Sequence, residues 1–192
     1  MSALIAEYVA RVRHRFTVAE ARAAAEAGVF GPWPKLELID GEILVVPADR
    51  GRTINWNIAI NRWLTVGLAN RPDLAIVPDK TLILSDYDAP SPDFYVFPSR
   101  IADPTEVRGP DVLLVIEVSD SSLGADLGAK AALYGLFGVR EYWVVDCADR
   151  RLHVHRLGAE GYGAPALFGP EETVAAALIP GLTLRLADLT RV

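Results

Sequence analysis

The chain has few of the residues that several classes of site require. Its 192 residues include a single cysteine, Cys147, which excludes an internal disulfide and a zinc site built from several cysteines. No apolar run approaches the roughly 18 residues of a transmembrane helix, and residues 1–15 lack the continuous apolar core of a signal peptide. We therefore expect a cytoplasmic protein with no membrane partner.

Basic charge is also scarce. The net charge is −6, and of the 19 basic residues only Lys35, Lys80 and Lys130 are lysines. This balance counts against a protein that coats nucleic acid, but it allows an enzyme with a local basic groove. Acidic metal ligands would add negative charge that a bound cation offsets. In so arginine-rich a chain, a lysine points to a place where a compact point charge is wanted.

The composition that remains is that of a globular domain. Hydrophobic residues make up 51% and charged residues 23% of the chain. A chain of this length buries about 70% of its unfolded surface as one domain, so we expect a single domain over 1–192, with 1–15 as a loosely held lead-in. Strand and helix patterns alternate along it, which predicts an α/β (α+β) fold with a mixed sheet and few helices.

Local signals place the expected elements. A capping box at Thr17 and Glu20 begins a helix that ends near Gly28, and Asp40-Gly41 is a two-residue hairpin turn. The other expected helices are an amphipathic one over 53–69, with Ile54, Ile58, Trp63 and Leu64 on its apolar stripe, and one over 125–137. The expected strands are a hairpin over 35–47, then 74–77, 81–84, 93–97, 112–119, 142–145, 151–157, 166–168, 173–176 and 182–186.

Glu117 is the most informative residue. It interrupts the apolar run 112–118, which otherwise reads as a strand buried on both faces. A carboxylate there is costly unless it is paired or binds a metal. The alternative, a glutamate facing solvent at a strand end beside an arginine, is disfavoured by the apolar residues on both sides.

Asp93 is a candidate site residue only in combination with Glu117. Alone, Pro92-Asp93 is a turn or loop signal. Two carboxylates that enter one site from neighbouring strands can hold a divalent cation such as Mg²⁺, which prefers oxygen ligands. Such a metal activates a water and neutralises charge on a phosphoryl oxygen, so the pair suggests a phosphodiesterase site.

Asp126, Lys130 and Tyr134 follow at helical spacing and should share one helix face. One interpretation is a surface ion pair worth about 0.3–0.5 kcal/mol. The other is a lysine that reaches the metal and orients the attacking water or stabilises the phosphate. Spacing does not decide between them, and by alternation alone Glu37 is a surface glutamate.

The remaining candidate residues give weaker evidence of a functional site. His153 and His155 share a strand face but have no evident third ligand, so we expect a half-exposed hairpin face. Cys147 has no partner pattern for a catalytic thiol. The aromatic residues Tyr134, Tyr142 and Trp143 read as core or as a dimer contact.

Short motifs across nearly the whole chain, taken in order, resemble the Uma-type family of restriction endonuclease-like proteins, within the PD-(D/E)xK nuclease superfamily. The motifs cover 16–20, 37–42, 91–94, 116–119, Asp126-x3-Lys130-x3-Tyr134, 138–146 and 180–184. The resemblance implies a restriction-endonuclease-like core, a central mixed sheet flanked by helices with added N-terminal and C-terminal hairpins. It also implies a DNA endonuclease that uses Mg²⁺ or Mn²⁺, and a homodimer.

The same resemblance implies roles for the site residues. Asp93 and Glu117 would bind the metal, and Glu37 would be an accessory acid near it. Ser119 stands where the superfamily has its lysine, and Lys130 from the next helix would replace that lysine, with Asp126, Ser119 and Tyr134 in support. The departure at Ser119 keeps an alternative open: a weakly active or inactive nuclease-like module that binds nucleic acid or dimerises. A hydrolase of a small phosphodiester is a third interpretation.

Overall fold

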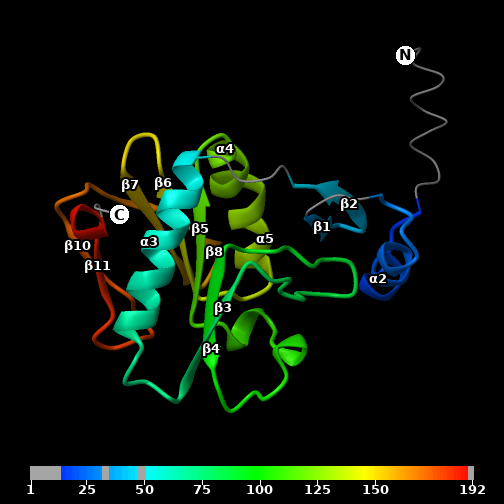
Figure 1. Cartoon of the computed structure of the whole chain (residues 1–192), viewed down its shortest axis with the longest axis horizontal. Helices are drawn as coiled ribbons and strands as arrows, with labels where there is room; N and C mark the ends of the chain where they lie inside the picture. The colour runs from blue at the N-terminus through cyan, green and yellow to red at the C-terminus, as the bar shows by residue number, and fades with distance from the viewer. Residues whose placement is uncertain (1–13, 32–34, 47–50, 190–192) are drawn as a thin grey trace.

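The protein is organised around one mixed β-sheet (Figure 1). The computed structural model describes residues 14–31, 35–46 and 51–189. Seven strands form the sheet in the order β3-β4-β5-β6-β7-β8, with β9 paired to β7. The strands are β3 (Leu74–Pro78), β4 (Phe94–Pro98), β5 (Leu114–Ser119), β6 (Glu141–Asp146), β7 (Arg151–Gly158), β8 (Gly161–Tyr162) and β9 (Ala166–Phe168).

Strands β5 and β6 run parallel, whereas the other pairs of this sheet are antiparallel. Parallel neighbours need a crossover connection, and here a helical segment supplies it. That segment is α4 (Leu123–Ala125), the π-helical stretch η3 (Asp126–Lys130) and α5 (Ala131–Leu136). The predicted α/β fold with a central mixed sheet is confirmed.

Helices cover both faces of the sheet. In Figure 1, α3 (Gly51–Gly67) and the α4–η3–α5 segment lie to either side of β5. Neighbouring residues of β6 point to opposite faces: Trp143 packs in the cluster that contains Ile60 and Leu64 of α3, and Tyr142 in the cluster that contains Tyr134 of α5. The aromatic residues at these positions are therefore core, as the sequence predicts.

Two small antiparallel pairs flank the sheet. One is the hairpin β1 (Leu36–Ile39) and β2 (Glu42–Val45), which follows helix α2 (Val18–Glu26), and the other is β10 (Thr173–Ala175) with β11 (Thr183–Arg185). Thr17 and Glu20 form the predicted capping box. The short helices are η1 (Pro104–Glu106), η2 (Gly109–Asp111) and η4 (Leu186–Leu189).

The first hairpin is fixed by its turn and by a contact with the body of the protein. Asp40 has φ 51° and Gly41 has φ 73°, the left-handed pair that a two-residue turn of this type needs. A Cβ at Gly41 would lie 2.9 Å from Arg15 Cα. Leu38 and Ala89 exchange backbone hydrogen bonds of 3.3 and 2.7 Å. This bridge holds β1 against the loop that leads to Asp93.

Two local predictions are wrong. Residues 81–84 are not a strand, because their amides bond within the loop, Leu82 N–H to Pro90 O and Leu84 N–H to Asp88 O. Of the predicted apolar stripe of α3, Leu64 is buried and Trp63 packs against the core, but Ile54 and Ile58 are 44% and 48% exposed. The other buried residues of α3 are Trp56, Ala59 and Ile60. The lead-in predicted over 1–15 falls largely outside the described residues.

In the part of the chain that the structure describes, no helix combines the length and the apolar character needed to cross a membrane.

Candidate active site

Glu117 is buried in the middle of the molecule, as its apolar neighbours predict. It lies near the end of β5, a strand that is buried throughout, and only 4% of the residue is exposed. Its Oε1 accepts hydrogen bonds from Lys130 Nζ at 3.0 Å and from Tyr134 Oη at 3.1 Å. The alternative of a solvent-facing glutamate is thereby excluded.

Asp93 enters the same site from the neighbouring strand. Phe94 of β4 pairs with Ile116 of β5, so continuing this antiparallel register by one residue sets Asp93 across from Glu117. Asp93 Oδ2 accepts the Val118 backbone N–H at 2.7 Å, which fixes the carboxylate on β5. Sheet pairing thus brings together two acids that are distant in the sequence.

The crossover helix brings the lysine. Lys130 lies in the π-helical stretch, a wider turn that recurs at functional sites. Its Nζ lies 3.0 Å from Glu117 Oε1, 3.1 Å from Glu37 Oε1 and 3.7 Å from Asp126 Oδ1. Because two of these acids come from β1 and β5, the interpretation of Lys130 as part of a simple surface ion pair with Asp126 is wrong.

Hydrogen bonds of Asp126 fix the helical segment that carries Lys130. Asp126 is buried, and its Oδ2 accepts hydrogen bonds from Ser119 Oγ at 2.8 Å and from Ser122 Oγ at 2.7 Å. Ser119 therefore anchors the start of the helix that carries Lys130. Asp126, Lys130 and Tyr134 do share one helix face, as their spacing predicts.

Glu37 does not lie at the surface, contrary to the prediction from alternation along the strand. Although it lies between Leu36 and Leu38 in β1, it is only 5% exposed. The loop tied to β1 by the Leu38–Ala89 bridge covers it, and the Ser91 backbone N–H donates to Glu37 Oε1 at 3.0 Å. Glu37 is thus inside the site, where the family resemblance expects an accessory acid.

The site holds more negative charge than its lysines offset. Burial, together with the charges of Asp93, Asp126 and Glu37, raises the pKa of Glu117 to about 8 against the opposing effect of Lys130. Burial alone would lower the pKa of Lys130, but its carboxylate neighbours raise it above its ordinary value. The amine is therefore a fixed cation, whereas Glu117 resists ionisation beside the other acids unless further positive charge is bound.

Sequence reasoning missed one residue of the site. Lys35, just before β1, has its Nζ 2.7 Å from Asp79 Oδ1 and 4.0 Å from Asp93 Oδ1. Burial alone would lower its pKa, but Asp79 and Asp93 raise it. The scarcity of lysine in the chain was the available signal, because two of its three lysines lie in this site.

The oxygen ligands suit a hard divalent cation. Asp93 and Glu117 offer carboxylate oxygens, and excess buried negative charge favours a bound cation. Over the described ranges, no group of three or more His, Cys, Asp and Glu side chains is arranged to hold a metal ion. Asp93 and Glu117 are the two carboxylates of this site that would hold such a cation.

Two other candidates from the sequence, Cys147 and His155, lie outside this site. Cys147 is buried, and burial raises the pKa of its thiol to about 12, so it is not an activated nucleophile. His155 is not half-exposed as expected: it is 4% exposed and its ring stacks on Tyr142 with centroids 5.7 Å apart.

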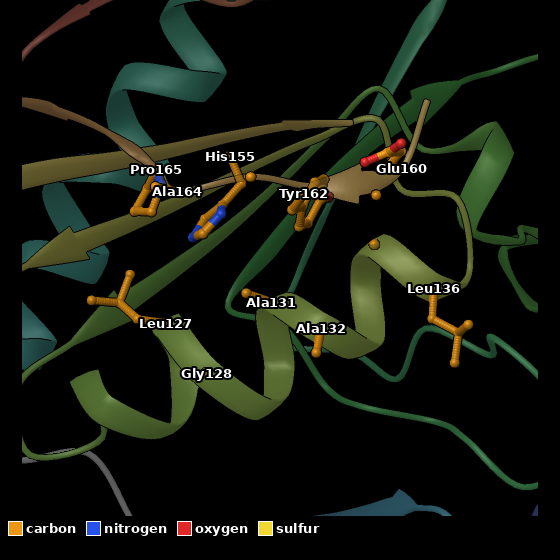
Figure 2. Close-up of a pocket in the computed structure, with 13 residues that line it drawn as sticks. Leu127, Gly128, Ala131, Ala132, Leu136, His155, Glu160, Tyr162, Ala164 and Pro165 are labelled. Atoms are coloured by element: carbon orange, nitrogen blue, oxygen red, sulfur yellow. The ribbon is translucent and has the colours of Figure 1, made fainter. Parts of the chain in front are cut away.

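A separate hollow lies between α5 and the loop after β8. Figure 2 shows His155 and Tyr162 facing Leu127 and Ala131 across it. Its volume is about 690 Å³, and its lining includes none of the acids Glu37, Asp93, Glu117 and Asp126.

Comparisons with known proteins also indicate a nuclease-like protein. The family model Uma2, described as "Putative restriction endonuclease", matches residues 20–187. Among solved structures, a protein from Anabaena variabilis ATCC 29413, described as a putative nuclease belonging to DUF820, shares 17% identity. The match covers 91% of this chain and 97% of that chain with a TM-score of 0.68, and at this identity it shows the fold alone. A search of curated proteins found no match.

Proposed function

Because the chain belongs to the Uma2 family, we propose that it is an endonuclease that hydrolyses DNA phosphodiester bonds with Mg²⁺, or Mn²⁺, as its metal. The observation that carries this proposal is the position of Lys130, within 3.1 Å of both Glu117 and Glu37. An amine from the crossover helix thus reaches the acids where the superfamily supplies a lysine from the strand itself.

Each side chain has a distinct part in this mechanism. Asp93 and Glu117 would hold the metal, which supplies Lewis acidity that activates a water and neutralises charge on a phosphoryl oxygen. Lys130 lies beside Glu117, where its fixed charge orients the attacking water or stabilises the phosphoryl group. Glu37 shares the amine and limits its motion. Tyr134 donates to Glu117 and holds that carboxylate in position.

The test is cleavage of plasmid and linear duplex DNA by the purified protein, with Mg²⁺ and with a chelator. We expect cleavage with Mg²⁺ that is lost in Asp93→Ala, Glu117→Ala and Lys130→Met. Asp73→Asn is a matched control, because Asp73 is an exposed carboxylate that pairs with Arg71 at the end of β3 remote from Asp79. Cleavage that survives both Asp93→Ala and Glu117→Ala would remove the proposal.

A second candidate function rests on Ser119 and on the net charge of −6. With a serine in the lysine position, the chain could serve as a nuclease-like module that binds nucleic acid or dimerises without efficient catalysis. Mg²⁺-dependent cleavage that is lost in Lys130→Met would dispose of it.

We also propose a homodimer, since two sites can then address the two strands of a duplex. Sedimentation of the purified protein tests this: a monomer at micromolar concentration, with and without DNA, contradicts it.

A further inference from the structure

The site contains a second lysine whose surroundings differ from those of Lys130. Lys130 is 18% exposed at its side chain and has three carboxylates within 4.0 Å, so its donors are directed at protein acids. Lys35 is 23% exposed, and its close partner among the described residues is Asp79, which is itself 71% exposed. The two amines are about equally exposed, but the carboxylates around Lys130 are buried, whereas the close partner of Lys35 is exposed.

Lys35 lies between the exposed carboxylate of Asp79 and the site carboxylate of Asp93. Its Nζ lies 4.0 Å from Oδ1 of Asp93, beyond hydrogen-bond distance, and 2.7 Å from Asp79. An ammonium group has three donors. An anion that approaches Asp93 from solvent can thus bind Lys35 without breaking the contacts of Lys130.

The segment that carries Asp79 is fixed relative to the site. The Asp79 backbone N–H donates to Asp93 O at 2.8 Å. Asp79 has φ 48°, in the left-handed region that aspartate enters more readily than most residues other than glycine. Its exposed carboxylate pairs with Lys35 beside the acids of the site.

We propose that Lys35 binds a backbone phosphate of the nucleic acid beside this site, and that Asp79 holds its amine in place until the phosphate arrives. The inference rests on the proposed function, because it takes a nucleic acid as the ligand. A lysine ammonium is a compact point charge suited to a phosphate oxygen. It also offsets the repulsion between an incoming phosphate and Asp93.

The test separates a phosphate contact from a structural ion pair. Duplex binding is measured against salt concentration for the full chain carrying Glu117→Gln, with Mg²⁺, so that no cleavage interferes. Adding Lys35→Met should weaken binding and reduce the slope of log K against log salt by about 0.9, the value for one phosphate contact. Lys35→Arg should keep the slope, and Asp79→Asn should retain or tighten binding.

Lys80→Met is the matched control, because it removes the same charge from an exposed lysine next to Asp79. An equal loss of slope in Lys80→Met and Lys35→Met indicates diffuse attraction and overturns the inference. An unchanged slope in Lys35→Met, with Lys35→Met and Asp79→Asn lowering the melting temperature alike, also overturns it.

Metal binding gives an independent readout. Removing a positive charge 4.0 Å from Asp93 should tighten Mn²⁺ binding to the DNA-free protein, by roughly fivefold from the size of one charge interaction at this distance in water. The gain is expected whatever else Lys35 binds, because it reports only that the charge of Lys35 acts on the acids of the site. Unchanged Mn²⁺ affinity in calorimetry would show that this charge does not act there, and it would contradict the inference.

These outcomes are distinct from failure of the proposed function. If the wild-type protein binds DNA without cleaving it, the proposed endonuclease activity is contradicted. The phosphate contact of Lys35 is still supported in that case if the salt slope of DNA binding falls only in Lys35→Met. A wild-type protein that cleaves DNA, with the slope unaltered by Lys35→Met, removes Lys35 alone. If the Glu117→Gln protein does not bind DNA even at low salt, the inference is overturned as well.

Discussion

Two buried glutamates lie on adjacent strands of the sheet, and their surroundings give them opposite uses. Glu141 of β6 is fully buried and accepts hydrogen bonds from Trp143 Nε1, Arg156 Nε and the Ala177 backbone N–H at 3.1, 3.0 and 2.7 Å. These donors reach both of its oxygens. Glu141 is therefore satisfied by the protein and joins β6 to β7 and to the segment after β10.

Glu117 of β5 is almost as deeply buried but is surrounded by acids. Both hydrogen bonds that it accepts from the described residues reach Oε1, and Asp93, Asp126 and Glu37 raise its pKa. Burial of a carboxylate thus does not by itself indicate function. The two glutamates differ in their neighbours. Hydrogen-bond donors surround Glu141 and make it structural, whereas further acids surround Glu117 and favour a cation beside it.

Glu117→Gln should give the largest effect and separates the two glutamates most clearly. It keeps the shape of the side chain but, on the proposed function, removes an oxygen that would bind the metal, so we expect cleavage to fall by at least about 10²–10³-fold. Because it also relieves repulsion among the acids, the midpoint of urea unfolding should stay the same or rise. A large loss of stability with retained cleavage would assign Glu117 to the structural class with Glu141.

Lys130→Met should reduce cleavage by about 10²-fold, the scale for one acid–base or electrostatic group. It should also destabilise the metal-free protein by about 3 kcal/mol, because three acids lose their cation. Mg²⁺ should then raise the melting temperature of Lys130→Met more than that of wild type. An equal rise in both proteins would mean that the lysine and the metal do not share the same carboxylates.

Glu141→Ala should reduce stability and leave the chemistry intact. It leaves the buried donors of Trp143 and Ala177 without an acceptor, at about 1–3 kcal/mol each. We expect the free energy of unfolding in urea to fall by about 2–4 kcal/mol, with the cleavage rate per folded molecule unchanged at a temperature where the variant is folded. A lower rate in fully folded Glu141→Ala would show that β6 is coupled to the site.

Tyr134→Phe should give the smallest effect. It removes one hydrogen bond to Glu117 Oε1 and leaves Lys130 in place, so we expect a loss of about 1 kcal/mol in stability. A decrease in cleavage of no more than about tenfold should accompany it. A loss as large as that of Lys130→Met would give the phenol a direct part in the reaction.

Much of the site could be predicted from local sequence. Glu117 is conspicuous because a buried β-strand tolerates a carboxylate only with partners, and Asp126, Lys130 and Tyr134 share a face because helical spacing is local. The meeting of Asp93 with Glu117 depends on strand register, which the sequence suggests only through the family resemblance.

What could not be predicted depends on contacts between distant segments. Glu37 is buried because a loop some fifty residues later bonds to β1, and alternation within a four-residue strand carries no information about that loop. The same limit applies to Ile54 and Ile58 of α3, since the direction in which a helix packs is set by the sheet below it. Lys35 was missed because its partner Asp79 lies in a turn with no sequence signature.

The helix that supplies Lys130 is also the connection that lets β5 and β6 run in the same direction. The pairing of β5 with β6 and the reach of Lys130 to Glu117 are therefore set by the same connection. A change in the length of this connection would alter both at once.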